Sequence, residues 1–305
     1  MTLREFDSHE ILGAEQDADM RAYINQLVNE LREDTPVYEK LKELHLTMKE
    51  VRENIAKLND FREDYHYCLK CPGITVCNKK TPHISMRVEK EDGFVKVQYE
   101  PCHKIVDQIR RDSRYMIHDF PNEWKLSTLK EMDLKENRRP VIKEFTKIVK
   151  DQSSRWLYLI GNHKVGKSHL LVTMANEFIA IKNEQVAVMN CVERIKQLAD
   201  LSMKEPEIFA NEISLLGDVP LLILDGFGEE YKSEYIRDSI IIPILSERER
   251  QNKATWFTSS FTINEVQELY SVGKTGGAIR GKQVGNILRE MCEEEFDLTG
   301  TSYKK

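Results

Sequence analysis

The chain has 305 residues, a formal net charge of −6, 31% charged side chains and 40% hydrophobic side chains. These values are typical of a soluble protein with a core, and the length suits two domains of about 100–200 residues each. The net charge gives no overall sign of nucleic-acid binding, so any such contact would be local. The charged first ten residues hold no secretory signal, and the longest apolar run, "SIIIPILS", is too short for a membrane span. We therefore expect a cytoplasmic protein with no membrane partner.

The first part of the chain has the spacing of amphipathic helices. Residues 19–32 place apolar side chains on one helical face, and the break at 34–36 contains a proline. A second apolar stripe at steps of three and four follows over 38–58. The sequence predicts a helical region over 1–66, as a partner-binding helix pair or as a plain intramolecular core.

Four of the six cysteines lie between positions 68 and 102. In a reducing compartment such a cluster indicates a metal site rather than disulfides. Alternating apolar runs flank Asp92-Gly93, a dipeptide typical of a two-residue β-hairpin turn. Such a turn pairs Glu91 with Phe94 and, further back along the strands, His83 with Cys102. Directly opposed residues are close enough to bind one ion.

The cysteine cluster therefore predicts a structural zinc ion in a zinc-ribbon-like β-hairpin module over 67–106. Closed zinc sites need four ligands, and "CLKC" supplies one C-x-x-C pair. The predicted ligands are Cys68, Cys71, His83 and Cys102. Cys77 is the alternative to His83, and His66 and His103 are further candidates. The alternative without a metal is a set of free buried cysteines beside a surface histidine.

Residues 107–136 are charged and irregular, which predicts a linker. Beyond it, apolar strands alternate with helices, and this pattern predicts an α/β fold with a mostly parallel sheet covered on both faces over 137–305. Five of the 14 glycines fall within 272–286, which predicts a mobile loop. The predicted strands read "WLYLI", "QVAVM", "LLILD" and "TWFTSS".

Residues 161–168, "GNHKVGKS", match the phosphate-binding pattern G-x-x-x-x-G-K-[ST] at every fixed position. An apolar strand precedes them and a helix follows, so backbone N–H groups and the helix dipole would face a β-phosphate. Lys167 would contact the β- and γ-phosphates of ATP, and Ser168 would bind Mg²⁺. The residues predicted to contact the nucleotide are Gly161, Asn162, His163, Lys164, Val165, Gly166, Lys167, Ser168 and His169.

The strand "LLILD" ends in Asp225, which predicts a carboxylate that holds the same Mg²⁺. The next position often holds a second acid that orients the attacking water, but here it is Gly226. The sequence therefore predicts binding of ATP or ADP with slow hydrolysis, so that the nucleotide acts as a switch. Glu229 and Glu230 are the nearest acids that could compensate.

With both sites in view, the chain resembles bacterial replicative helicase loaders of the primosomal DnaI/DnaC type over nearly its whole length. That resemblance implies a AAA+ ATPase domain, and an N-terminal zinc-binding domain that grips the hexameric replicative helicase. It also implies contact with single-stranded DNA, for which Lys274, Arg280 and Lys282 are candidates. The matching segments are "CLKC", His83, "EPC", "LYLIGNHKVGKSHLL", "PLLILDGFGEE", "SEYIRDSIIIPIL" and "WFTSSFTINEVQELY".

The same resemblance implies roles for individual residues around the nucleotide. Arg248 resembles the arginine finger that reaches a neighbouring subunit's γ-phosphate, with Arg250 and Arg237 as alternatives. Ser260 stands where an asparagine usually senses that phosphate. Asn286 falls near the expected sensor arginine, which leaves Arg289 or Arg280 as substitutes.

The implied function is ATP-dependent delivery of a hexameric helicase to single-stranded DNA during initiation or restart of replication. Self-association and other primosome proteins are further expected contacts. Two alternatives share the same nucleotide site: a transposition-type AAA+ regulator, and an adaptor in which ATP is a structural ligand without turnover. The cysteine module and the early helices favour the loader.

Overall fold

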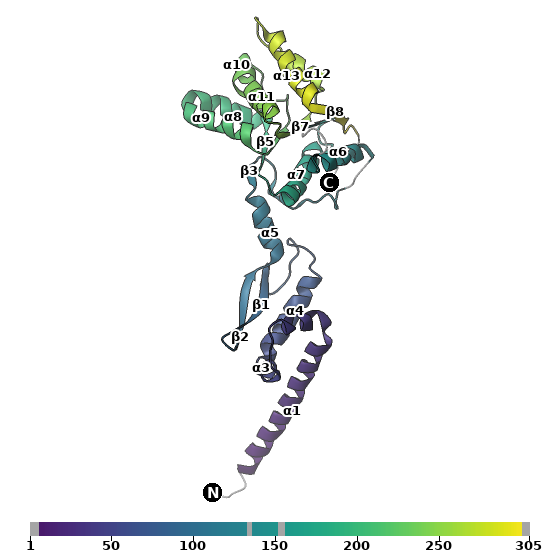
Figure 1. Cartoon of the computed structure of the whole chain (residues 1–305), viewed down its shortest axis with the longest axis vertical. Coiled ribbons are helices and arrows are strands. Elements are labelled where there is room, and N and C mark those ends of the chain that lie inside the picture. The colour runs from purple at the N-terminus through teal and green to yellow at the C-terminus, as the bar shows by residue number, and fades with distance from the viewer. Residues whose placement is uncertain (1–5, 133–135, 152–155, 301–305) are drawn as a thin grey trace. The chain divides into compact units, whose positions relative to one another are not determined.

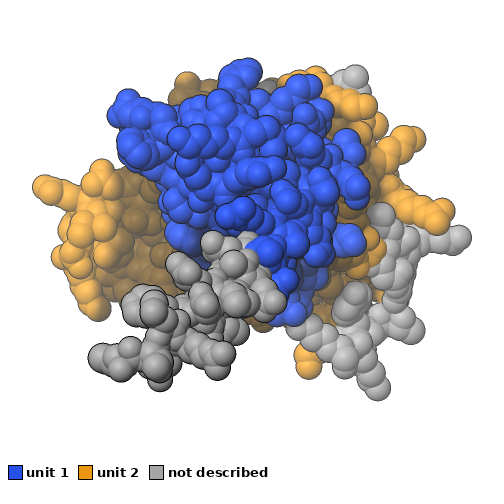
Figure 2. Space-filling model, turned by 90° about the horizontal axis from the view of Figure 1, so that it is seen from below, with its two compact units in different colours: residues 1–107 blue, residues 108–305 orange. Residues whose placement is uncertain are grey.

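A computed structural model describes residues 6–132, 136–151 and 156–300 of the chain. Expectations that fall on 1–5, 133–135, 152–155 and 301–305 lie outside the described residues, among them the ends of the predicted helical region, linker and ATPase domain. The chain divides into two compact units, 1–107 and 108–305, coloured blue and orange in Figure 2. None of the described helices is long and apolar enough to cross a bilayer.

The first unit packs four helices and one β-hairpin around a single core (Figure 1). The predicted second helix over 38–58 is in fact interrupted, because Thr47 and Glu50 form a capping box that starts a new helix. Val37 and Leu58 are fully buried, and Val88 and Val95 of the hairpin pack into the same cluster. The helices and the hairpin are therefore one folding unit rather than separate modules. The elements are α1 (Phe6–Glu33), α2 (Thr35–Lys42), α3 (Met48–Glu53), α4 (Ile55–Leu69), β1 (Ile84–Glu91) and β2 (Phe94–Pro101).

The hairpin has the register expected from its turn. Asp92 and Gly93 adopt φ angles of 51° and 82°, the left-handed conformation that a two-residue hairpin turn requires. Glu91 pairs with Phe94 next to the turn, and the ladder extends to the pair Ile84 and Pro101 at its other end. Beyond the ladder, the amide of Cys102 donates to the carbonyl of His83 at 2.8 Å, so the predicted opposition of these two residues is confirmed.

The second unit is built on a six-stranded sheet in the order β3-β5-β6-β7-β4-β8, in which every neighbouring pair is parallel. The predicted α/β fold is confirmed. The strands are β3 (Tyr115–His118), β4 (Trp156–Ile160), β5 (Val186–Asn190), β6 (Leu221–Asp225), β7 (Ala254–Ser259) and β8 (Cys292–Asp297).

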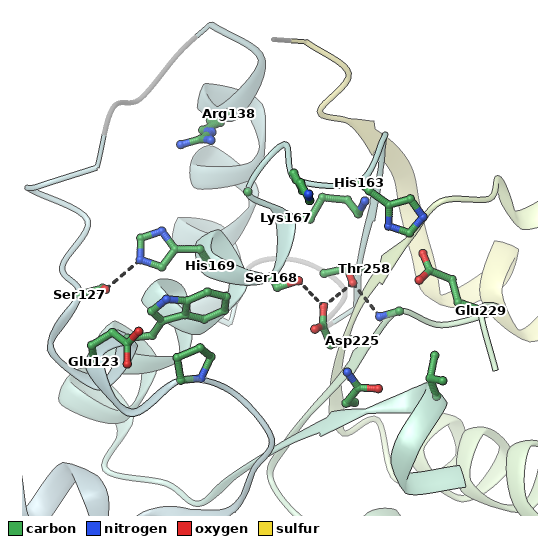
Figure 3. Close-up of a pocket in the computed structure, with 17 residues that line it drawn as sticks. Glu123, Ser127, Arg138, His163, Lys167, Ser168, His169, Asp225, Glu229 and Thr258 are labelled. Carbon is green, nitrogen blue, oxygen red and sulfur yellow. Dashed lines mark hydrogen bonds between the residues drawn. The ribbon is translucent and has the colours of Figure 1, made fainter. Parts of the chain in front are cut away.

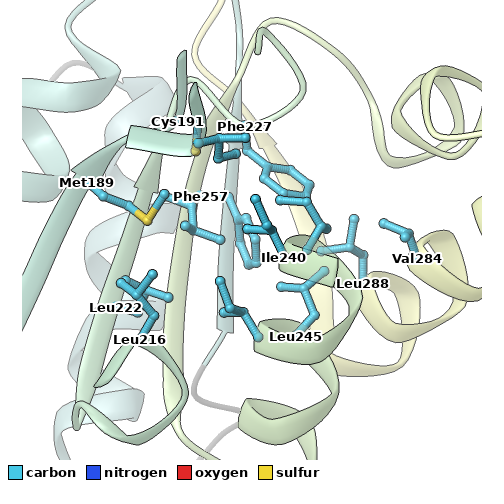
Figure 4. Packing of buried hydrophobic residues seen from close by; sticks show 14 of the residues in the cluster. Met189, Cys191, Leu216, Leu222, Phe227, Ile240, Leu245, Phe257, Val284 and Leu288 are labelled. Atoms are coloured by element: carbon cyan, nitrogen blue, oxygen red, sulfur yellow. The ribbon is translucent and has the colours of Figure 1, made fainter. Parts of the chain in front are cut away.

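Helices cover both faces of this sheet, and each face has its own core. Along β4, Trp156 and Tyr158 belong to one cluster, whereas Leu157 and Leu159 belong to the other, as the two-residue period of a strand requires. Figure 4 shows the first cluster. The helices of this unit are α6 (Arg139–Val149), α7 (Lys167–Lys182), α8 (Cys191–Lys204), α9 (Pro206–Asp218), α10 (Glu234–Ile236), α11 (Ile242–Arg250), α12 (Ile263–Leu269) and α13 (Gly277–Met291), with a π-helical turn η3 (Arg237–Ile241) between α10 and α11. Helix α5 (His103–Asp112) contains the boundary between the two units.

Two expectations of irregular structure are wrong. The expected linker over 107–136 contributes β3 to the sheet edge and a 3₁₀ turn, η1 (Asn122–Leu126), and Phe120 and Trp124 pack on the core. The glycine-rich stretch 272–286 is largely helix α13, which packs closely on α12. A Cβ at Gly281 would lie only 2.5 Å from the Gln267 carbonyl oxygen. Gly277, Gly281 and Gly285 therefore serve close packing rather than mobility.

Candidate nucleotide-binding site

The predicted phosphate-binding loop joins β4 to α7 at the carboxyl edge of the parallel sheet. The ends of β6 and β7 meet at the same edge, where ligands of such sheets usually bind. Gly161 and Gly166 have φ angles of 145° and 92°, which side chains rarely adopt. A Cβ at Gly161 would also lie 3.2 Å from the backbone at Leu298 and Thr299. The two glycines of the G-x-x-x-x-G-K-[ST] pattern are therefore required by the backbone conformation of this loop.

A cavity of about 780 Å³ opens beside this loop (Figure 3). Its volume suits a ligand the size of a nucleotide, because small-molecule sites commonly measure about 300–1,000 Å³. The lining residues are Pro121, Glu123, Trp124, Ser127, Arg138, His163, Lys164, Gly166, Lys167, Ser168, His169, Asn190, Val192, Asp225, Gly226, Glu229 and Thr258.

The polar corner of the cavity is centred on the carboxylate of Asp225. The hydroxyls of Ser168 and Thr258 each donate to its Oδ1 at 2.6 Å, and Figure 3 shows both aimed at that carboxylate. Thr258 also accepts from the amide of Gly226 at 2.9 Å. Two hydroxyls and one carboxylate are hard oxygen donors, which suit a Mg²⁺ ion that keeps several waters. Sequence reasoning placed Ser168 and Asp225 here and missed Thr258.

Lys167 lies against the loop that precedes it. Its side-chain Nζ donates to the carbonyls of Gly161 at 2.6 Å and Asn162 at 3.0 Å, and the residue is 8% exposed. Burial lowers the pKa of the Lys167 ammonium, whereas the charges of Glu229 and Asp225 act to raise it. An anionic phosphate would compensate this ammonium for its partial loss of water.

The predicted nucleotide contacts divide into two groups. His163, Lys164, Gly166, Lys167, Ser168 and His169 line the cavity. Gly161 and Asn162 lie at the base of the loop, where they accept from Lys167, and Val165 is buried. The loop therefore offers some residues to a ligand and uses the others to hold its own shape.

One wall of the cavity comes from the segment expected to be a linker. Pro121, Trp124 and Ser127 line it, and the Ser127 hydroxyl lies 2.9 Å from Nε2 of His169. The rings of Trp124 and His169 have centroids 5.1 Å apart. This wall is aromatic, which suits a planar base. In the sequence, the one feature that could have indicated this wall is Trp124, a tryptophan within a charged stretch.

Arg138 is a second residue that sequence reasoning missed. It lies at the end of the 3₁₀ turn η2 (Glu136–Arg138), is 3% exposed and lines the cavity. Its Nη2 donates to the carbonyl of Val165 at 3.1 Å. It therefore brings positive charge to the cavity and holds the phosphate-binding loop from behind.

Ser260 follows β7, next to the cavity, but its hydroxyl is engaged. It donates to Oε1 of Glu229 at 2.6 Å. Glu229 lines the cavity, whereas Ser260 does not. The role of Ser260 in sensing the γ-phosphate stays a prediction. Glu230 is 2% exposed and points elsewhere, since its carboxylate accepts from Tyr270 and from the amide of Gly228.

The arginine-finger prediction for Arg248 is wrong. Its side chain has 0% exposure and donates to Thr255 and to backbone carbonyls that include those of Leu216 and Val219, both at 2.8 Å. Burial lowers the pKa of its guanidinium to about 9. A group sealed in this way cannot reach a neighbouring subunit.

The alternative arginines differ in exposure. Arg237 is 2% exposed and bonds to Asp238 and to the carbonyls of Tyr270 and Val272, so it is also structural. Arg250 is exposed and pairs with Glu247 on the same helix. Arg250 is therefore the one of the three that could act on a second subunit.

The sensor arginine stays a prediction. Arg289 donates to Asn264, Gln267 and Asn286, and Arg280 bonds to Gln283. Neither lines the cavity described above. Lys274, Arg280 and Lys282, the candidates for DNA contact, are all exposed, and that contact also stays a prediction.

The predicted zinc site is not supported. Over 6–132, 136–151 and 156–300, no three His, Cys, Asp or Glu side chains converge on a point that could hold a metal ion. The Lys79 ammonium lies 3.5 Å from Sγ of Cys68, and Nε2 of His83 lies 2.8 Å from the carbonyl of Ile74. Backbone amides of His83 and Lys79 lower the pKa of the Cys77 thiol. Cys68, Cys71, Cys77 and Cys102 are free cysteines. Opposition of His83 and Cys102 in the hairpin was correct, but it does not bring their side chains onto one ion.

Comparison with known proteins finds similarity in sequence and in structure. No family model matches the chain. It is 22% identical over 268 residues to the replicative helicase loader DnaI of Bacillus subtilis (strain 168), and the match covers 85% of each protein. A crystal structure of DnaI matches with 24% identity and a TM-score of 0.51, over 64% of this chain and 100% of that one. A crystal structure of a protein described as a primosome component, from Streptococcus pyogenes serotype M3, matches with 23% identity and a TM-score of 0.50, over 65% and 99%.

The structural matches show the fold, and the sequence match extends over most of the chain. The chain is therefore similar to the replicative helicase loader DnaI in sequence over 268 residues and to a crystal structure of DnaI in fold.

Proposed function

We propose that this protein is a nucleotide-controlled loader of a replicative helicase. The observation that carries the proposal is the meeting of Lys167, Ser168 and Asp225 in one cavity, in a chain similar to a replicative helicase loader over 268 residues. The loop and Asp225 come from separate segments, so their meeting is a property of the fold.

ATP or ADP with Mg²⁺ is the ligand that fits this cavity best. Lys167 and the amides at the start of α7 would hold the phosphates, and the oxygens of Ser168 and Asp225 would hold the metal. The base would pack against the wall of Pro121, Trp124 and His169. Bound Mg²⁺ would neutralise phosphate charge, while the chain's residues position it.

The first unit would bind the hexameric helicase. Its surface carries exposed apolar side chains on α1, including Met20 and Tyr23, and on the hairpin, including Phe94 and Tyr99. Exposed side chains of this type are enriched at protein interfaces. Single-stranded DNA would contact the second unit, where Lys274 and Lys282 are exposed.

Nucleotide-dependent co-purification with the cognate replicative helicase tests the proposal. The wild-type chain should co-purify with the helicase and bind ATP. Lys167→Ala should still co-purify but fail to transfer the helicase to single-stranded DNA. If Lys167→Ala loses only thermal stability and still loads, ATP is a structural ligand and the adaptor alternative is correct. If the wild-type chain binds no helicase, the proposal fails.

A further inference from the structure

The acid that is missing at position 226 has a close neighbour in space. Residues 226–229 form a β-turn, closed by the amide of Glu229 donating to the carbonyl of Gly226 at 3.0 Å. Gly226 and Gly228 have φ angles of 73° and 84°, and a positive φ at the third position of such a turn favours glycine. The turn brings Glu229 back beside residue 226.

The carboxylate of Glu229 lies close to where a side chain at position 226 would begin. A Cβ built on Gly226 would be 3.4 Å from Oε2 of Glu229. Glu229 lines the cavity, and its charge acts on the Lys167 ammonium, as does that of Asp225. The carboxylate is therefore within electrostatic range of the group that would hold the phosphates.

Ser260 holds this carboxylate from the neighbouring strand end. Its hydroxyl donates to Oε1 at 2.6 Å, while Oε2 is the atom nearest the Gly226 position. Other acids near the site are differently placed. Asp225 accepts from Ser168 and Thr258, and Glu230 is buried against Tyr270.

We infer that Glu229 replaces the second acid from three positions downstream, as the catalytic residue that orients and deprotonates the attacking water. The inference rests on the proposed function. The water oxygen forms a bond to the γ-phosphorus, the bond from that phosphorus to the bridging oxygen breaks, and ADP leaves with the electron pair. Glu229 accepts the proton from the water and passes it to the released phosphate. Ser260 is a positioning residue that fixes the carboxylate.

The test compares Glu229→Gln with Glu268→Gln in the full chain, with helicase and single-stranded DNA present. Glu268 is an exposed acid of α12 in the same unit and does not line the cavity, so Glu268→Gln is the control and should hydrolyse ATP at the wild-type rate. Glu229→Gln should slow single-turnover ATP hydrolysis by about 100-fold, a typical loss for a general base. Its affinity for a fluorescent ATP analogue should stay within about threefold of wild type. After gel filtration it should retain ATP where wild type retains ADP.

The positioning role of Ser260 has its own readout. Ser260→Ala should lower kcat with the KM for ATP unchanged, and Ser260→Thr, which keeps the hydroxyl, should recover most of the rate. Hydrolysis by Glu229→Gln at the wild-type rate, with ATP bound normally, overturns this inference and leaves the proposed function intact. No hydrolysis by wild type under the same conditions also overturns it. No ATP binding by wild type instead refutes the proposed function, and this inference with it.

Discussion

The two ends of the strands in the six-stranded sheet treat buried polar groups in opposite ways. At the carboxyl ends, Lys167 and Asp225 border a cavity and bond to neighbours that a ligand could replace. At the amino ends, the Arg248 guanidinium is enclosed by the backbone before β6 and at the start of β7. Lys167 and Arg248 both carry a charge and have low exposure, but only Lys167 borders open space. Burial of a charge is therefore not in itself a sign of a binding site.

The difference lies in what satisfies each charge. The Arg248 guanidinium donates to carbonyl and hydroxyl acceptors within the fold, so its hydrogen bonds are made without a ligand. Burial lowers the pKa of both groups, so the pKa does not distinguish them. Lys167 differs because it lines the cavity, where an anionic ligand can contact its ammonium. Substitutions at the two ends should therefore affect different measurements.

Arg248→Ala should cause the largest effect. It leaves several buried acceptors without a donor, each costing roughly 1–3 kcal/mol, so the free energy of unfolding should fall by about 3 kcal/mol or more. Urea unfolding followed by circular dichroism measures this. Arg250→Ala on the exposed face of the same helix is the control and should change stability by less than about 0.5 kcal/mol. Equal effects of the two substitutions would contradict the contrast between the two ends of the sheet.

Lys167→Ala should leave stability nearly unchanged and remove nucleotide binding. Loss of charge-assisted hydrogen bonds to phosphate, at about 3 kcal/mol, corresponds to about 100-fold weaker ATP affinity. Titration with a fluorescent ATP analogue measures the affinity. Lys164→Ala, in the same loop, is the control for loss of positive charge alone. Affinity within threefold of wild type for Lys167→Ala would show that the cavity is not a phosphate site.

Thr258→Val should have a smaller effect that depends on magnesium. The hydroxyl that donates to Asp225 is removed while the side-chain shape is retained, so Asp225 is less well held. Groups behind a metal ligand typically contribute about 10–100-fold to metal affinity, and we expect about tenfold weaker ATP binding in Mg²⁺. Binding measured in EDTA should change little. A loss of the same size in EDTA would place Thr258 in folding rather than in metal binding.

Glu230→Gln should show the smallest effect, as a dependence of stability on pH. Burial raises the pKa of Glu230 above its ordinary 4.5, with the Tyr270 hydroxyl opposing. The folded state therefore holds this proton more tightly, so the contribution to stability is present below pH 4.5 and is lost as pH rises through the folded-state pKa. Wild-type stability minus that of Glu230→Gln should fall with rising pH, by about 1.4 kcal/mol per unit of pKa shift. A difference that stays constant between pH 4 and 8 would refute the burial argument.

Local patterns were informative where a backbone conformation demands particular residues. The spacing of Gly161, Gly166 and Lys167 follows from the turn and helix start of a phosphate-binding loop, and Asp92-Gly93 follows from the φ angles of a hairpin turn. Alternation of strands and helices predicted the parallel sheet. These features are recognisable because each depends on residues close together in the chain.

Side-chain partners from distant segments could not be predicted in this way. The pairing of Ser260 with Glu229, the enclosure of Arg248 and the wall containing Trp124 each join residues brought together by packing. The cysteines show the limit: hairpin register placed His83 opposite Cys102, yet the imidazole contacts Ile74. Register specifies which backbones face each other, whereas the direction of a side chain depends on the charges and volumes of all its neighbours.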